Sequence, residues 1–269
     1  MTEPVWEFPL RLPRHAFSPR DAARAGDVWR CFQEAAVEAS TRAGWPPQRY
    51  REARTAFVVR QMTVVHHREA TYGEHTRART WVWRFRRDTI STREVRLLGD
   101  DGPVASASQE WVHVSAELKP ARAGVELTSC FPNHDEGPPV AFPEWAPEPG
   151  AAHSFRVKCW YTWMDPLAHV NHPAYVDWCD EGISRVMVER GLSPVALQPV
   201  AEKMTFRVGV APPDEVTIES RRVGRTAAGE LVLAHRVLTD DGTLCVDGHT
   251  VRRLACGDSR ALLGAFDAS

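Results

Sequence analysis

RLLGDDGPVASASQEWV, residues 96–112, and RVLTDDGTLCVDGHTVR, residues 236–252, share one pattern in the two halves of the chain. Each stretch is a run of strand-forming residues, the turn Asp-Asp-Gly, and a second such run. Asp-Gly between two runs of this kind is a strong signal for a β-hairpin. The stretches begin about 140 residues apart, and such self-similarity at a fixed offset predicts an internal duplication.

A helical pattern precedes the strands in both halves. GDVWRCFQEAAVEASTRAG, residues 26–44, and PAYVDWCDEGISRVMVERG, residues 173–191, place apolar side chains three and four positions apart, and WRCFQEAA aligns with YVDWCDEG. Runs rich in β-branched and aromatic residues are typical of strands and follow each helix, at 56–68, 75–87, 91–99 and 103–115 in the first half and at 203–208, 215–224, 230–242 and 243–254 in the second. A further strand is expected at 153–163, before the second helix.

The duplication predicts an α+β protein of two tandem units. A helix that is apolar on one face needs a sheet to cover that face, so each unit is expected to wrap an antiparallel sheet around its long helix. Proline, glycine and acidic residues are frequent at 129–150, which is typical of a linker. We therefore expect an N-terminal unit over 1–128, a linker over 129–150 and a C-terminal unit over 151–269.

Composition argues against several classes of partner. The formal net charge of −2 does not favour a nucleic-acid surface, and no apolar run approaches the roughly 18 residues that span a bilayer. The six cysteines are scattered and the first residues lack a signal-peptide pattern, so a reducing cytoplasm is the expected location. Two basic stretches could meet an anionic ligand or be solvated strand edges: Arg84, Arg86, Arg87 and Arg93, and Arg221, Arg222 and Arg225.

The most specific motif lies in MDPLAHVNHPAYVDW, residues 164–178. It is similar to the hotdog signature Asp-x3-His-Val-Asn-x3-Tyr, with Asp165, His169, Val170, Asn171 and Tyr175 at the matching positions. Together with GEHTRARTWVWRF and GPVASASQEWVHV in the first half, this order of segments resembles the acyl-ACP thioesterases of plants and bacteria over nearly the whole chain. The resemblance implies a double hotdog fold and hydrolysis of an acyl thioester, on acyl carrier protein or coenzyme A, in fatty acid biosynthesis.

Thioester hydrolysis needs a base or nucleophile beside the carbonyl carbon and hydrogen-bond donors beside the developing oxyanion. Asp165 is the candidate that activates water or attacks the carbonyl, the alternative being an aspartate that only caps a turn. His169 or His172 is expected to orient the acid, hold water or bind the thioester oxygen, while the other histidine packs. Pro173 suits a first helical turn capped by Asn171 or His172, so the amides of that turn are the expected oxyanion donors.

Four further side chains of this region have two interpretations each. Asn171 is expected to fix the loop, with substrate contact as its other role. Tyr175 and Trp178 contact the substrate or fill the core. Glu181 is either a second carboxylate of the site or part of an exposed helix face.

The family pattern is incomplete at three positions. Plant members carry an asparagine where Leu167 stands, and an acidic residue and a cysteine where Gly209 and Val210 stand. No cofactor is expected. No metal site is expected either, because the prolines beside the two histidines interrupt the continuous helix that would bring both rings onto one ion.

The first half lacks the acidic loop, since SPRDAARAGDV, residues 18–28, keeps neither the His-Val-Asn run nor an aspartate in register. We interpret this half as a structural copy that supplies pocket walls, and the second half as the catalytic one. The alternative function is a hotdog protein that binds, dehydrates or cyclises an acyl or polyketide thioester without hydrolysing it. A homodimer is compatible with both functions.

Overall fold

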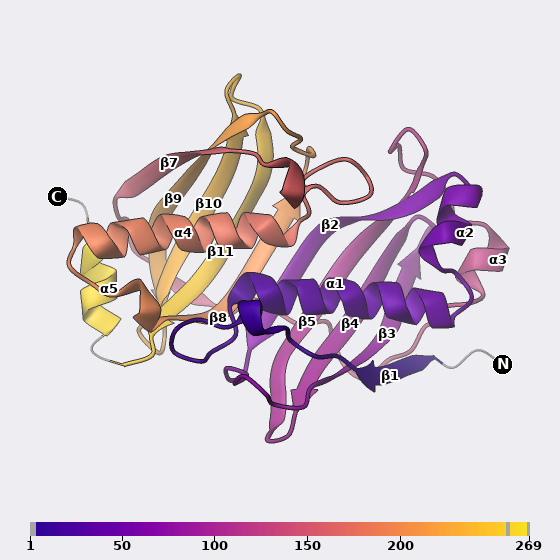
Figure 1. Cartoon of the computed structure of the whole chain (residues 1–269), viewed down its shortest axis with the longest axis horizontal. Coiled ribbons are helices and arrows are strands. Elements are labelled where there is room, and N and C mark those ends of the chain that lie inside the picture. Colours follow the sequence, from indigo (N-terminus) through magenta and orange to yellow (C-terminus); the bar gives the residue numbers. More distant parts are fainter. Residues whose placement is uncertain (1–3, 257–258, 268–269) are drawn as a thin grey trace. The chain divides into compact units, whose positions relative to one another are not determined.

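The computed structural model describes residues 4–256 and 259–267, and the chain divides into two compact units (Figure 1). The first unit takes in most of the chain up to Ala141, and the second takes in most of the chain from Phe142 onward. The division falls within the proline-rich stretch 129–150. Each unit combines a long helix with an antiparallel sheet.

In the first unit, α1 lies across the face of its sheet (Figure 1). Its helices are α1 Ala25–Arg42, α2 Pro47–Glu52 and α3 Val125–Thr128. Its strands are β1 Val5–Pro9, β2 Thr55–His66, β3 Arg77–Arg86, β4 Ile90–Gly99 and β5 Gly102–Ser115, in the order β1-β3-β4-β5-β2. The side-chain nitrogen of Gln109 on β5 donates to the backbone oxygen of Phe32 on α1 at 3.1 Å, which joins sheet and helix.

In the second unit, α4 packs against β7 and β9. Its helices are α4 Pro173–Glu189 and α5 Ser259–Ala265. Its strands are β6 Trp145–Pro147, β7 Ala152–Lys158, β8 Leu197–Phe206, β9 Glu215–Thr226, β10 Leu231–Thr239 and β11 Leu244–Leu254, in the order β8-β11-β10-β9, with β6 and β7 both pairing with β9.

The two units repeat one topology. In each, the first strand after the long helix lies beside the last strand of the unit: β2 beside β5, and β8 beside β11. A strand before the long helix pairs in both units with the second strand after that helix: β1 pairs with β3, and β7 pairs with β9. The predicted tandem repeat of a helix and an antiparallel sheet is therefore confirmed.

Both Asp-Asp-Gly turns form the predicted hairpins. In the first unit Gly99 of β4 pairs with Gly102 of β5. In the second, the N–H of Gly242 donates to the carbonyl of Thr239 at 2.9 Å. Gly102 and Gly242 have φ values of 101° and 83°, in the region that glycine alone enters without strain.

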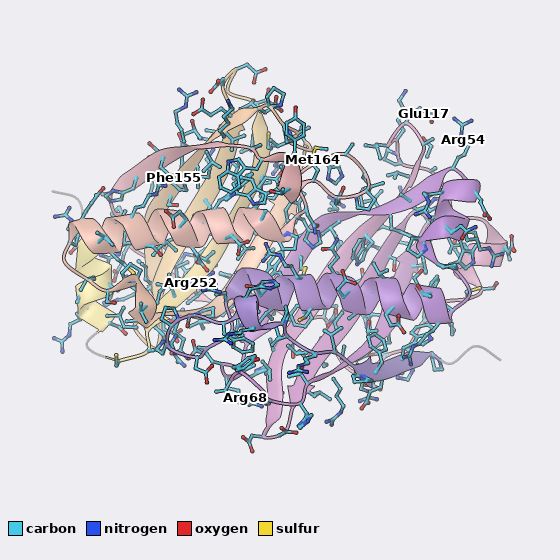
Figure 2. The ribbon with its side chains drawn as sticks, in the orientation of Figure 1. Arg54, Arg68, Glu117, Phe155, Met164 and Arg252 are labelled. Atoms are coloured by element: carbon cyan, nitrogen blue, oxygen red, sulfur yellow. The ribbon has the colours of Figure 1, made fainter. Side chains whose placement is uncertain are left out.

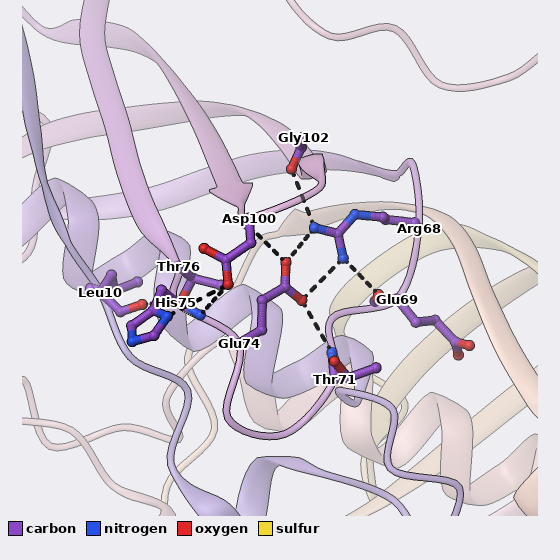
Figure 3. Close-up of polar contacts among 9 residues, drawn as sticks. All are labelled: Leu10, Arg68, Glu69, Thr71, Glu74, His75, Thr76, Asp100 and Gly102. Atoms are coloured by element: carbon purple, nitrogen blue, oxygen red, sulfur yellow. Dashed lines mark hydrogen bonds and ion pairs between the residues drawn. The ribbon is translucent and has the colours of Figure 1, made fainter.

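A nearly buried carboxylate anchors the loop between β2 and β3 to the first of these turns (Figure 3). Glu74 accepts hydrogen bonds from the guanidinium of Arg68, with Nη1 and Oε2 3.0 Å apart, and from the backbone N–H of Asp100 at 3.2 Å. A Cβ at Gly99 would lie 1.8 Å from Oε1 of Glu74, so a larger residue at 99 would displace the carboxylate from this position. The hydrogen bond from Arg68 lowers the pKa of Glu74 and keeps it ionised.

Several elements differ from the sequence expectation. The strand expected at 153–163 ends at Lys158 and is followed by a 3₁₀ helix, Tyr161–Trp163. The short elements β1, β6, α2, α3 and α5 were not anticipated, because segments of three to seven residues carry little periodic signal. Among these, α5 completes a core, since Leu262 and the following Phe266 are buried with Ile183 of α4.

Ion pairs are buried beneath α4 in the second unit. Arg252 of β11, labelled in Figure 2 next to α4, has no exposed surface. Its Nε donates to Oδ1 of Asp180 on α4 at 2.8 Å, and its Nη1 donates to Glu202 on β8. Burial alone lowers the pKa of a guanidinium, but the charges of Asp180 and Glu202 outweigh burial and raise the pKa of Arg252. The helix is therefore tied to two strands of its sheet.

His235 of β10 is buried in the same unit between two hydroxyl groups. Its Nδ1 lies 2.8 Å from Oγ of Ser220 on β9, and its Nε2 lies 2.8 Å from Oγ1 of Thr250 on β11. A neutral imidazole has one donor and one acceptor nitrogen, and hydroxyl groups can match both. Burial lowers the pKa of His235 to about 3, so its ring is neutral in the folded chain near pH 7.

We predict that His235 makes the folded state sensitive to acid. The unfolded chain binds the proton near the ordinary histidine pKa of about 6.5, whereas the folded chain binds it only near pH 3, so the stability that this residue contributes falls as the pH drops from 6.5 towards 3. The loss reaches up to about 1.4 kcal/mol per pH unit. Urea unfolding of wild type and His235→Gln between about pH 7 and pH 4.5 should show a shallower pH dependence for the variant. Equal slopes would contradict the assignment.

Candidate active site

The loop at 164–172, which leads into α4, is closed by hydrogen bonds of its own backbone. The N–H of Asp165 donates to the carbonyl of His169 at 2.9 Å, and the N–H of Ala168 donates to the carbonyl of Asp165 at 3.0 Å. Ala168 has a φ of 62°, a left-handed conformation that is uncommon for a residue with a side chain. The loop is a tight turn that brings Asp165 and His169 together.

Two further hydrogen bonds attach this loop to its neighbours. Met164, labelled in Figure 2, marks the start of the loop. The N–H of Val170 donates to the carbonyl of Val210, beyond β8, at 2.7 Å. The N–H of Asn171 donates to the carbonyl of Trp163, in the preceding 3₁₀ helix, at 2.8 Å. The side chains of the loop therefore project from a backbone that is fixed on both sides.

The carboxylate of Asp165 has two partners. Its Oδ1 accepts the N–H of Leu167 at 2.8 Å, and its Oδ2 lies 3.4 Å from Nδ1 of His169. The first contact is the turn cap that the sequence allowed as an alternative role. The second makes Asp165 and His169 a carboxylate–imidazole pair, in which the side chains are 12% and 25% exposed. Nδ1 faces the carboxylate, so Nε2 of the ring is directed away from Asp165.

The ring of His169 packs against Gly209. A Cβ at residue 209 would lie 3.2 Å from Cβ and 3.3 Å from Cδ2 of His169, which is tighter than an ordinary carbon contact. Gly209 is one of the positions where the family pattern has a polar residue. In this chain the missing side chain leaves room for His169 to lie beside Asp165.

His172, unlike His169, packs against a strand of the sheet. It is buried, and its ring meets Phe206 of β8 edge to face, with centroids 5.6 Å apart. Tyr175 and Trp178 of α4 are also buried and their rings are 4.9 Å apart, which agrees with their interpretation as core residues. Burial raises the pKa of Tyr175, so its hydroxyl stays protonated. Phe206 was not expected here, because strand periodicity does not say which residue meets a helix start.

The first turn of α4 differs from the expectation of free amide donors. Pro173 occupies the first helical position, as predicted, and has no N–H. The N–H groups of Ala174 and Tyr175 donate to the carbonyls of Asn171 and His172, at 3.0 and 3.3 Å. These two amides already have partners, so the oxyanion donors predicted from the sequence are not free in this conformation. The positive end of the helix dipole remains beside the loop.

Asn171 and Glu181 have separate roles. The backbone of Asn171 bonds to Trp163 on one side and to Ala174 on the other, consistent with a residue that fixes the loop. The side chain of Glu181 is 53% exposed and accepts a hydrogen bond from Nε of Arg185 at 2.9 Å. Glu181 therefore lies on an exposed face of α4 and is not part of the Asp165–His169 pair.

Among residues 4–256 and 259–267, no three His, Cys, Asp or Glu side chains lie close enough together to hold an ion.

The start of α1 in the first unit differs from the start of α4. Its first turn carries Asp27, whose Oδ1 accepts a hydrogen bond from Arg30 at 3.2 Å. In the described part of the chain no helix is long and apolar enough to cross a membrane.

Residues 159–262, which include the loop and α4, match the family model described as the thioesterase-like superfamily. The match takes in most of the second unit, which therefore resembles this superfamily in sequence. The sequence matches no curated protein. Asp165, His169 and the adjacent Gly209 all lie within the matched segment.

Three solved structures share the fold over nearly the whole chain. A protein from Lactobacillus plantarum, assigned as an oleoyl thioesterase, is 16% identical with a TM-score of 0.80 and covers 94% of this chain and 97% of its own. A 12:0-ACP thioesterase from Umbellularia californica is 13% identical, with a TM-score of 0.75 and coverage of 93% and 94%. An acyl-ACP thioesterase from Bacteroides thetaiotaomicron is 13% identical, with a TM-score of 0.73 and coverage of 93% and 98%. The predicted double hotdog fold is confirmed.

We predict that the turn needs an oxygen acceptor at residue 165 but not a charge. Asp165→Ala removes the acceptor for the N–H of Leu167 and should lower the free energy of unfolding by about 1 to 3 kcal/mol. Asp165→Asn keeps an oxygen there and should cost less than about 1 kcal/mol. Chemical denaturation of the two variants measures the difference, and an equal loss in both would show that the charge itself stabilises the loop.

Proposed function

We propose that this thioesterase-like chain hydrolyses an acyl thioester to a free acid and a thiol. The observation that carries the proposal is the carboxylate of Asp165 3.4 Å from Nδ1 of His169, within the matched segment. An imidazole whose Nδ1 faces a carboxylate is a suitable general base, because the carboxylate orients the ring and stabilises the imidazolium that forms.

In the proposed reaction, Nε2 of His169 removes a proton from water. The water oxygen bonds to the carbonyl carbon of the thioester, and the carbonyl oxygen gains the negative charge. When the carbon–sulfur bond breaks, the imidazolium returns the proton to sulfur, which leaves as the thiol. Direct attack by Asp165 is disfavoured, because Oδ1 accepts the N–H of Leu167 and Oδ2 faces His169.

The start of α4 supports the developing oxyanion through its dipole. A helix N-terminus is equivalent to roughly half a positive charge and favours an anion within its first turn. The loop at 164–172 ends where α4 begins, so charge that develops beside His169 is close to that turn. The amides of Ala174 and Tyr175, which donate within the turn, contribute to the dipole rather than as free donors.

Acyl carrier protein is the carrier that we propose for the acyl group. Two of the proteins with this fold are an acyl-ACP thioesterase and a 12:0-ACP thioesterase, which supports the choice. The same acyl group on coenzyme A is the comparison substrate. A higher kcat/KM for the carrier-protein form would agree with the proposal, and a preference for coenzyme A would change the carrier but not the reaction.

We predict that removing either member of the pair abolishes most turnover. Asp165→Asn keeps the oxygen that accepts from Leu167 but removes the charge, and His169→Asn keeps a polar group near Asp165 but removes Nε2. Each should lower kcat by about 10²- to 10⁴-fold, the usual contribution of general acid–base catalysis. Thiol release from acyl-ACP, measured beside the melting temperature, separates loss of catalysis from loss of folding.

Asp21→Asn is the matched control for Asp165→Asn. Asp21 is an exposed aspartate with a φ of 58° that precedes α1, and asparagine tolerates that backbone conformation. The variant should keep wild-type turnover. A kcat for Asp165→Asn within threefold of wild type would contradict the proposed mechanism, and wild-type protein that binds acyl-ACP without releasing thiol would contradict the function.

We also predict that Gly209→Ala lowers turnover while the protein stays folded. The added Cβ would displace the ring of His169 by a few tenths of an ångström, and small displacements of a reacting group are costly, so kcat/KM should fall about tenfold. Gly124→Ala is the control, because a Cβ there meets no atom within 4 Å. Unchanged turnover in Gly209→Ala would show that the position of His169 does not limit the reaction.

A further inference from the structure

Arg93 of β4 points into the interior of the first unit. It pairs across the sheet with Gln109 of β5, so the two side chains share one face. Gln109 bonds to the backbone of α1, which makes this the face that the helix covers. Val95 and Leu97, at alternate positions along β4, are fully buried on the same face. Arg93 keeps only 5% of its surface exposed.

The guanidinium of Arg93 lies among groups that cannot neutralise it. It is 5.8 Å from the ring centroid of Trp6 and 5.4 Å from that of Phe131. Its Nη1 donates to Oγ1 of Thr80 at 3.3 Å. Across the described ranges 4–256 and 259–267, no carboxylate forms an ion pair with it. Burial lowers the pKa of Arg93 to about 10, so it remains a cation at neutral pH.

The other deeply buried arginines of this chain are compensated. Arg252 pairs with two carboxylates, those of Asp180 and Glu202. Arg222 likewise pairs with Glu148 and Asp267. A buried charge is costly unless it is paired and hydrogen-bonded. Contacts with aromatic rings and one hydroxyl recover only part of that cost. Arg93 therefore keeps one positive charge that no carboxylate of the described residues balances.

We propose that Arg93 is the receptor for the carboxylate of an apolar ligand that binds inside the first unit. One unpaired cation balances one negative charge, which favours a carboxylate over a phosphate dianion. The planar guanidinium matches the two oxygens of a carboxylate. The rings of Trp6 and Phe131 and the neighbouring aliphatic side chains suit a hydrocarbon chain behind that carboxylate. The site concerns the first unit alone and does not depend on the proposed hydrolysis.

The test is the binding of octanoate to the full chain, measured by calorimetry. Arg93→Met removes the charge with little change in volume and should weaken octanoate binding at least tenfold. Arg93→Lys keeps the charge without the planar fork and should bind with intermediate affinity. Octan-1-ol has a similar chain without the charge, and its affinity should be equal in wild type and Arg93→Met. Arg84→Met, at an exposed arginine of β3, should bind octanoate as wild type does.

The melting temperature of ligand-free protein supplies a second measurement. Because Arg93 is unpaired, Arg93→Met should melt at or above the wild-type temperature, whereas a structural arginine would lower it. The proposal is overturned if wild type does not bind octanoate, or if octanoate binds Arg93→Met within threefold of wild type, as it would at a site elsewhere. A large fall in the melting temperature of Arg93→Met would also overturn it.

Discussion

Arg252 connects the middle of α4 to its sheet through two carboxylates, Asp180 on the helix and Glu202 on β8. Removing one partner from a buried ion pair typically costs about 3 to 5 kcal/mol, because the remaining charge is left buried without compensation. The Asp180–Arg252 pair therefore fastens the middle of α4 to β11, and the Arg252–Glu202 pair joins β11 to β8. On the same helix Tyr175 and Trp178 are buried and Glu181 is exposed, so α4 turns one face to the core.

The candidate active site depends on that helix position. The loop at 164–172 ends at Pro173, and the ring of His172 packs on Phe206 of β8, so the loop is placed by the helix on one side and by the sheet on the other. Within it, the carboxylate of Asp165 holds the turn through Leu167 and faces His169 with its second oxygen. One side chain thus both shapes the loop and forms half of the residue pair.

The sequence predicts the fold well because the helices and hairpins have strong local signals. The period of the apolar residues defines α1 and α4, and both Asp-Asp-Gly turns form hairpins. The strand expected to reach Trp163 stops at Lys158, since aromatic residues at 160–163 imitate a strand while forming a 3₁₀ helix. The sequence could not say which of His169 and His172 meets Asp165, because a loop has no period. The sequence does carry a signal for the burial of Arg93, because it alternates along the strand with Val95 and Leu97. The neighbouring basic residues instead favoured its interpretation as part of a basic stretch.

A single turnover of acyl-ACP in ¹⁸O-labelled water tests the central claim most directly, namely that the Asp165–His169 pair activates water. The account predicts one free thiol for each free acid, one ¹⁸O atom in the acid, and no ¹⁸O in the peptide that contains Asp165. Incorporation of ¹⁸O into Asp165 would show that the carboxylate attacks the thioester itself and would contradict the mechanism. The absence of free acid and thiol would contradict the function.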